Sequence, residues 1–72
     1  MIRNVEESTG YFVVARELAD ARELFKRATR VADAFPALAT YYRLMALSAL
    51  VEAEEWRDMV RAARRERLAG AS

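Results

Sequence analysis

Apolar residues recur at alternating spacings of three and four along residues 11–35. This spacing keeps one side of an α-helix apolar and is typical of a coiled-coil seam. The opposite side is charged, and Glu23 can pair there with Arg27 one turn later. We therefore predict an amphipathic helix over about residues 9–34. Its apolar column consists of Tyr11, Val14, Leu18, Ala21, Phe25, Ala28, Ala32 and Phe35.

The start of this helix has two interpretations. Ser8 or Thr9 can accept a hydrogen bond from the free amides of the first helical turn. Alternatively, Asn4 can cap an earlier first turn, with Glu7 three residues later as in a capping box. We favour the first interpretation and expect residues 1–8 to form a loosely ordered lead-in.

Pro36 predicts a change of chain direction. Proline lacks an amide N–H and clashes with the preceding turn, so Phe35 should leave the helix. Proline also suits the first position of a new helix. We predict a second helix over residues 36–68, a frayed tail at 69–72, and an all-α, two-helix antiparallel hairpin. A single long helix kinked at Pro36 is the alternative.

The second helix is apolar on more than one side. Leu44, Leu47 and Val51 project about 140–180° away from its inner stripe, whereas Leu50 lies nearer one flank. A hairpin cannot bury both sides of one helix, so we interpret these four residues as an association surface with Tyr41 at its rim. The inner stripe, which we expect to pack against the first helix, consists of Leu38, Tyr42, Met45, Ala49, Trp56, Val60 and Ala63.

The length of the chain favours a partner for this surface. A domain of 72 residues buries only about 60% of the surface of its unfolded chain, and without cysteine it has no disulfide to compensate. Oligomerisation is the remaining common means of stabilisation. We predict a homo-oligomer, in the first place a homodimer that forms a four-helix bundle. Two alternatives are an obligate heteromeric partner and coverage by the N-terminal segment with Ile2 and Val5.

The residue types that are missing argue against an enzyme. The chain has no histidine and no cysteine, which removes the usual nucleophile–base pairs and the usual transition-metal ligands. Its two glycines cannot form a glycine-rich phosphate loop. We therefore expect no catalytic residue, no metal and no cofactor. Glu52 falls near the edge of the inner stripe, where we expect it to form a structural ion pair.

The charge balance argues against nucleic acid as the main partner. Twelve basic and eleven acidic residues give a net charge of +1. Arg57, Arg61, Arg64 and Arg65 nevertheless cluster on an outward face of the second helix. We interpret them as a solvated face that the helix dipole favours; contact with nucleic acid or an acidic protein is the alternative.

The N-terminal sequence does not have the pattern of a signal peptide, because two glutamates follow Arg3 and no apolar run comes next. The apolar stretch of the second helix is too short to cross a bilayer and contains Arg43. We expect a cytoplasmic, non-enzymatic interaction or oligomerisation module. The alternatives are a small nucleic-acid-associated regulator and an accessory subunit of a larger complex.

Overall fold

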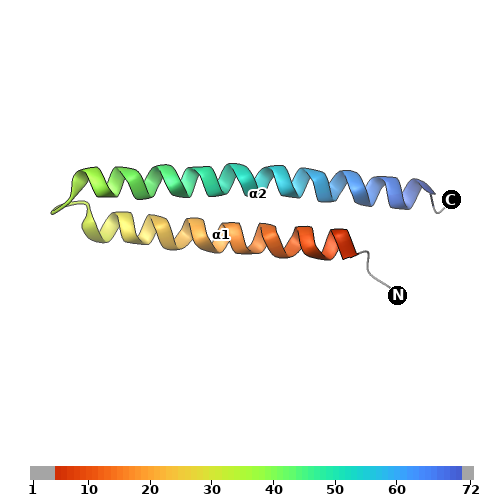
Figure 1. Ribbon diagram of the computed structural model, residues 1–72, viewed down its shortest axis with the longest axis horizontal. Helices are drawn as coiled ribbons and strands as arrows, with labels where there is room; N and C mark the ends of the chain where they lie inside the picture. The colour runs from red at the N-terminus through yellow and green to blue at the C-terminus, as the bar shows by residue number, and fades with distance from the viewer. Residues whose placement is uncertain (1–4, 71–72) are drawn as a thin grey trace.

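Two long helices lie side by side and antiparallel in a single layer (Figure 1). The structure, a computed structural model, describes residues 5–70. Helix α1 spans Val5–Val31 and helix α2 spans Pro36–Gly70. The molecule is correspondingly long and thin, at 58 × 18 × 11 Å. The predicted all-α hairpin is confirmed, and the alternative of one long kinked helix is wrong.

Both helices extend further than the sequence suggested at the open end of the hairpin. Helix α1 begins at Val5, so residues 5–8 form its first turn and not a loose lead-in. Ser8 and Thr9 consequently lie inside the helix and do not cap it, while Asn4 and the rest of the lead-in lie outside the described residues. Helix α2 continues through Gly70, two residues past the predicted end, and the remainder of the predicted tail is likewise outside the described residues.

The corner between the helices depends on Phe35. Its amide donates to the carbonyl of Val31 (2.7 Å), which closes the end of α1. Its own carbonyl accepts from the amide of Ala39 (3.0 Å), which begins the hydrogen bonding of α2. No residue in the described part of the chain has a positive φ. The corner therefore needs neither the glycine nor the asparagine that commonly ends a helix.

The seam between α1 and α2 is made of small side chains. In α2 the buried positions 39, 46, 53 and 60 repeat every seven residues, as in a coiled coil. No side chain larger than alanine is fully buried among the described residues. Small residues of this kind let two helix backbones approach closely. The buried apolar side chains are Ala21, Ala28, Ala39, Ala46, Ala49, Ala53 and Val60.

The register of the two helices follows from two close contacts. Gly10 lies against Val60 so closely that a Cβ on residue 10 would clash with the valine side chain. Halfway along the hairpin, Ala21 and Ala49 belong to the same buried cluster. In both pairs the two residue numbers add up to 70. A residue of α1 and a residue of α2 therefore lie at the same height along the hairpin when their numbers add up to about 70.

The predicted seam is rotated relative to the observed one. Tyr11, Leu18 and Phe25 are 43%, 45% and 37% exposed, although the sequence pattern placed them between the helices. Leu38 and Met45, predicted for the inner stripe of α2, are exposed to a similar extent. The physical reason is the close approach of the backbones, which leaves room for alanine but pushes larger side chains to the flanks of the seam. The predicted residues that do face the seam include Val14, Ala21, Ala28, Ala49 and Val60.

An ion pair joins the first turns of α1 to the last turns of α2. Arg67 donates from Nε to Glu7 Oε1 (2.7 Å) and from Nη2 to Glu7 Oε2 (3.3 Å). The side chain of Glu7 is almost fully buried, and this two-point contact fixes the geometry of both groups. The interaction also raises the pKa of Arg67, mainly through the hydrogen bond to Glu7 and its charge.

Candidate interaction surface

One broad face of the hairpin carries large apolar side chains from both helices, and we call it the apolar face. Leu18 of α1 and Leu50 of α2 line a shallow groove together with Glu54 and Arg57. The other members follow from steps of seven residues, which return to nearly the same side of a helix. We define the apolar face as Tyr11, Leu18, Phe25, Leu47 and Leu50.

The structure distributes the predicted association residues over more than this face. Leu47 is 50% exposed and lies on the apolar face, whereas Leu50 is half-buried and packs against the cluster around Ala21. Leu44 and Val51, at 61% and 56% exposed, lie on the outer edge of α2 next to this face. The surface is therefore wider than the four predicted residues, and Leu50 also stabilises the hairpin itself.

Tyr41 does not lie at the rim of the apolar face. It precedes Ser48 by seven residues, and Ser48 lines a groove on the opposite broad face. Its exposed ring instead lies 6.0 Å from the ring of Tyr42, measured between centroids.

Sequence reasoning missed the contribution of α1 to this surface. Tyr11, Leu18 and Phe25 were assigned to the seam because they are large and follow the correct period. The signal that could have placed them outside is the alanine column beside them. A helix pair held together by alanines at every seventh residue leaves no room for a second column of large side chains.

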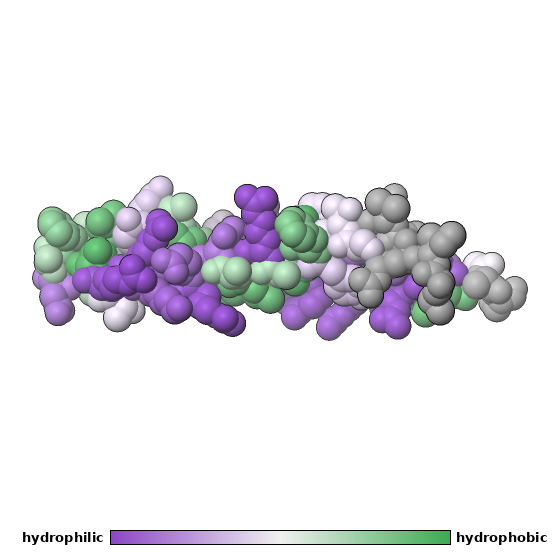
Figure 2. Space-filling model, turned by 90° about the horizontal axis from the view of Figure 1, so that it is seen from below, coloured by the Kyte–Doolittle hydropathy of each residue, from purple (hydrophilic) through white to green (hydrophobic). Residues whose placement is uncertain are grey.

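Apolar groups also reach other parts of the surface. Figure 2 shows the edge formed by α1, where hydrophobic side chains reach the surface near the turn and again near the middle, between charged ones. Phe12 and Phe35, at 66% and 61% exposed, are two large apolar side chains outside the apolar face. Phe12 directly follows Tyr11 in the first half of α1, whereas Phe35 lies at the corner, so the two do not form one patch.

The four predicted arginines come together around a second groove, which we call the arginine groove. Arg57, Arg61, Arg64 and Arg65 line it with Tyr11 and Leu68. Tyr11 belongs to the apolar face, and Arg57 also lines the shallow groove beside Leu18 and Leu50. The arginine groove therefore continues the apolar face towards the open end of the hairpin. The grouping concentrates positive charge at the C-terminal end of α2, where the helix dipole favours it.

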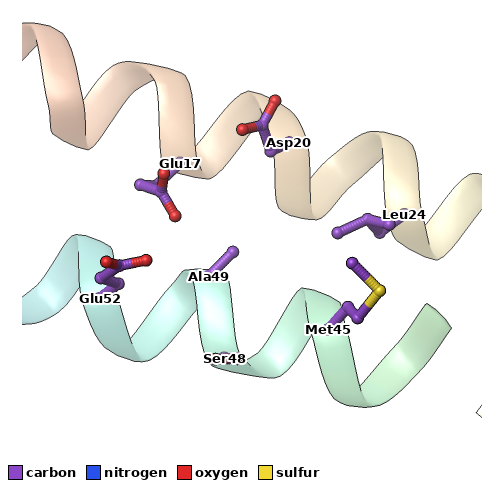
Figure 3. Close-up of a pocket in the computed structure, with 7 residues that line it drawn as sticks. All are labelled: Glu17, Asp20, Leu24, Met45, Ser48, Ala49 and Glu52. Carbon is purple, nitrogen blue, oxygen red and sulfur yellow. The ribbon is translucent and has the colours of Figure 1, made fainter. Parts of the chain in front are cut away.

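The opposite broad face contains an acidic groove (Figure 3). The carboxyl groups of Glu17 and Glu52 point towards each other across the two helices, with Asp20 nearby. Partial burial, the hydrogen bond to Glu52 and the negative charges of Glu52 and Asp20 raise the pKa of Glu17, and Arg16 opposes the shift. The expectation of an ion pair at Glu52 is thus wrong, because its neighbour across the groove is another carboxyl. The groove is lined by Glu17, Asp20, Leu24, Met45, Ser48, Ala49 and Glu52.

Within residues 5–70 no group of three acidic side chains is arranged to hold a metal ion. Neither described helix contains an apolar run long enough to cross a bilayer. Comparison with protein-family models, curated proteins and solved structures finds no match to this chain.

Proposed function

We propose that this protein is a non-enzymatic helical interaction module that associates through its apolar face. The observation that carries the proposal is the distribution of side-chain sizes: alanines fill the seam, while most leucines and aromatic residues are exposed outside it. A globular domain normally buries its large apolar side chains between two packed layers. This hairpin has one layer, so a second layer has to come from a partner.

The exposed area supports the same conclusion. The chain exposes 5761 Å², which is about 1,200 Å² more than the roughly 4,500 Å² typical of a compact monomer of this mass. A protein–protein interface of standard size covers about 800 Å² on each partner. The excess exposed area is therefore large enough for one such interface.

The proposal is tested by solution mass from light scattering on a size-exclusion column, over a dilution series. We expect an oligomer that dissociates on dilution. Leu47→Glu places a charge on the apolar face and should shift the protein to the monomer at every concentration tested. Ala62→Glu is the matched control, because Ala62 is exposed and lies two heptads after Ser48, away from the apolar face.

Two results would favour the alternatives to this function. A well-folded wild-type monomer at high concentration, unchanged in mass and stability by Leu47→Glu, contradicts association. It would favour coverage of the apolar face by the N-terminal segment of the chain itself. However, α1 starts beside the C-terminal end of α2, away from residues 44–51 (Figure 1). Aggregation or poor folding of the isolated chain would favour an obligate heteromeric partner.

The arginine groove supports a second candidate function, the binding of a single-stranded nucleic acid. It places an aromatic ring beside four guanidinium groups, and single-strand binders combine stacking platforms with positive charge in this way. Fluorescence anisotropy with a labelled oligonucleotide at low salt tests this function. Changing Arg61, Arg64 and Arg65 to alanine should abolish binding and leave the oligomeric mass unchanged. Binding no tighter than that of a neutral polymer rejects the function.

A further inference from the structure

We infer that the partner at the apolar face is a second copy of this chain, stacked face to face and running antiparallel to the first. The inference rests on the proposed function and adds the identity and orientation of the partner. The two-fold axis of this dimer lies between the two hairpins and runs perpendicular to their helices. It passes α1 at the level between residues 21 and 22, and α2 at the level between residues 48 and 49. Each hairpin would then supply one layer of a four-helix bundle.

The column of α1 on the apolar face is symmetric about this axis. Tyr11, Leu18, Phe25 and Ala32 follow one another at intervals of seven, so their midpoint falls between residues 21 and 22. A two-fold rotation at that level places Leu18 against Phe25 of the second copy, and Tyr11 against its Ala32. A large side chain therefore meets either another large side chain or an alanine that leaves room for it.

The face of α2 has its own centre of symmetry at the same level. Leu47 and Leu50 are equidistant from the midpoint between residues 48 and 49, and so are Arg43 and Glu54. The rotation therefore pairs Leu47 with Leu50 of the second copy, and Arg43 with its Glu54. Because the numbers of opposing residues add up to 70, this midpoint lies directly opposite that of α1. One axis thus relates apolar positions of both helices and the charged positions of α2.

Charge also selects this orientation over its main competitor. If the two hairpins stacked with their turns at the same end, the two arginine grooves would lie together at the other end, and like charges at an interface are costly. In the antiparallel arrangement the two Arg61 side chains lie about 37 Å apart, at a rise of about 1.5 Å per residue. This separation exceeds the screening length of about 8 Å at physiological salt several times.

Charge reversal at the paired positions tests the arrangement through the dimer dissociation constant. Arg43→Glu alone, or Glu54→Arg alone, turns two attractive pairs into two repulsive ones and should weaken the dimer about tenfold or more. The double variant R43E/E54R should restore the wild-type constant. Within one chain the two residues are about 16 Å apart along α2, so restoration requires contact between chains.

Cysteine cross-linking gives an independent readout, because the chain has no cysteine of its own. A mixture of R43C and E54C proteins should form a disulfide-linked dimer under mild oxidation, and each protein alone should form far less.

Arg22 lies beside the axis, where it approaches Arg22 of the second copy at the rim. Arg22→Gln should therefore tighten the dimer.

The outcomes separate this inference from the proposed function. A dimer in which the double variant fails to recover and the mixed cross-link is absent overturns the antiparallel arrangement but leaves association intact. A protein that remains monomeric at all concentrations overturns both. A chain that becomes stably folded only with a different polypeptide overturns the second copy as partner.

Discussion

At the scale of single residues, the close approach of the helices depends on positions without a large side chain. Gly10 is the clearest of these, because an added Cβ would overlap the side chain of Val60. Alanine would favour the helical state of the backbone by about 1 kcal/mol relative to glycine. Overpacking in a tight interior costs about 1–3 kcal/mol, so steric overlap should win.

Gly10→Ala should therefore destabilise the protein, with a net loss of up to about 2 kcal/mol in the free energy of unfolding. Urea denaturation followed by circular dichroism measures it. Gly70→Ala is the matched control, since nothing lies within 4 Å of its added Cβ, and it should be neutral or slightly stabilising. In a G10A/V60A protein the smaller residue 60 should relieve the overlap. A cycle of these variants in which the two effects simply add would contradict the steric explanation.

The paired carboxyls of Glu17 and Glu52 make stability depend on pH. The pKa of Glu17 is raised in the folded state above its ordinary value of 4.5, by partial burial and by Glu52. The folded protein thus holds this proton more tightly than the unfolded chain does. The resulting stabilisation is complete below pH 4.5 and is lost as the pH rises through the raised pKa.

Glu17→Gln should remove this loss, because an amide keeps the shape and hydrogen bonding of the side chain without its charge. We expect the variant to be more stable than the wild type near pH 7, with the difference shrinking towards pH 4. Thermal unfolding at a series of pH values measures the effect. Glu55→Gln, at an exposed position outside the acidic groove, is the matched control. Parallel pH curves for Glu17→Gln and the wild type would contradict the explanation.

At the scale of elements, the helices are joined at one end by the corner at Phe35 and at the other by Glu7 and Arg67. The ion pair acts on the part of the hairpin that lies farthest from the chain connection. The ends of helices fray most easily, so a contact between two of them limits local opening.

Arg67→Ala should therefore loosen the open end of the hairpin more than Arg64→Ala does. Arg64 is the matched control because it is an exposed arginine in the same region of α2 and lines only the arginine groove. Amide hydrogen exchange should speed up in the first two turns of α1 in the Arg67 variant alone. Equal exchange rates in the two variants would show that the ion pair does not hold the ends together.

The sequence predicts these elements more successfully than the side chains between them. Pro36 and the apolar period of three and four are local signals, and they were sufficient to predict two helices and a hairpin. The faces were harder, because ranking residues by size and apolarity favours Leu18 and Phe25 over Ala21. Gly10 and Glu17, which also face the other helix, carry no apolar signal at all. How closely two backbones approach depends on both helices together, and no single segment encodes it.

At the scale of the whole molecule, the hairpin has a long surface and a thin interior. If association supplies its second layer, folding and binding become linked, and stability should depend on protein concentration. The thermal midpoint should rise by several degrees when the concentration increases from about 1 to 100 μM. Differential scanning calorimetry measures this shift. In Leu47→Glu the midpoint should be lower and independent of concentration, and a wild-type midpoint that is equally constant would contradict the linkage.

The alanine seam has a consequence for how this protein tolerates mutation. Alanine scanning identifies most protein cores by the damage that truncation causes, but six of the seven buried apolar side chains among the described residues are already alanine. Such a scan would report a molecule with almost no core and would find its sensitive positions on the outside, where leucines and aromatic residues lie. Substitution towards larger residues would give the opposite map. At Ala21, Ala46 and Ala49, valine or leucine would force the backbones apart, so the least conspicuous residues of this chain should be the least replaceable.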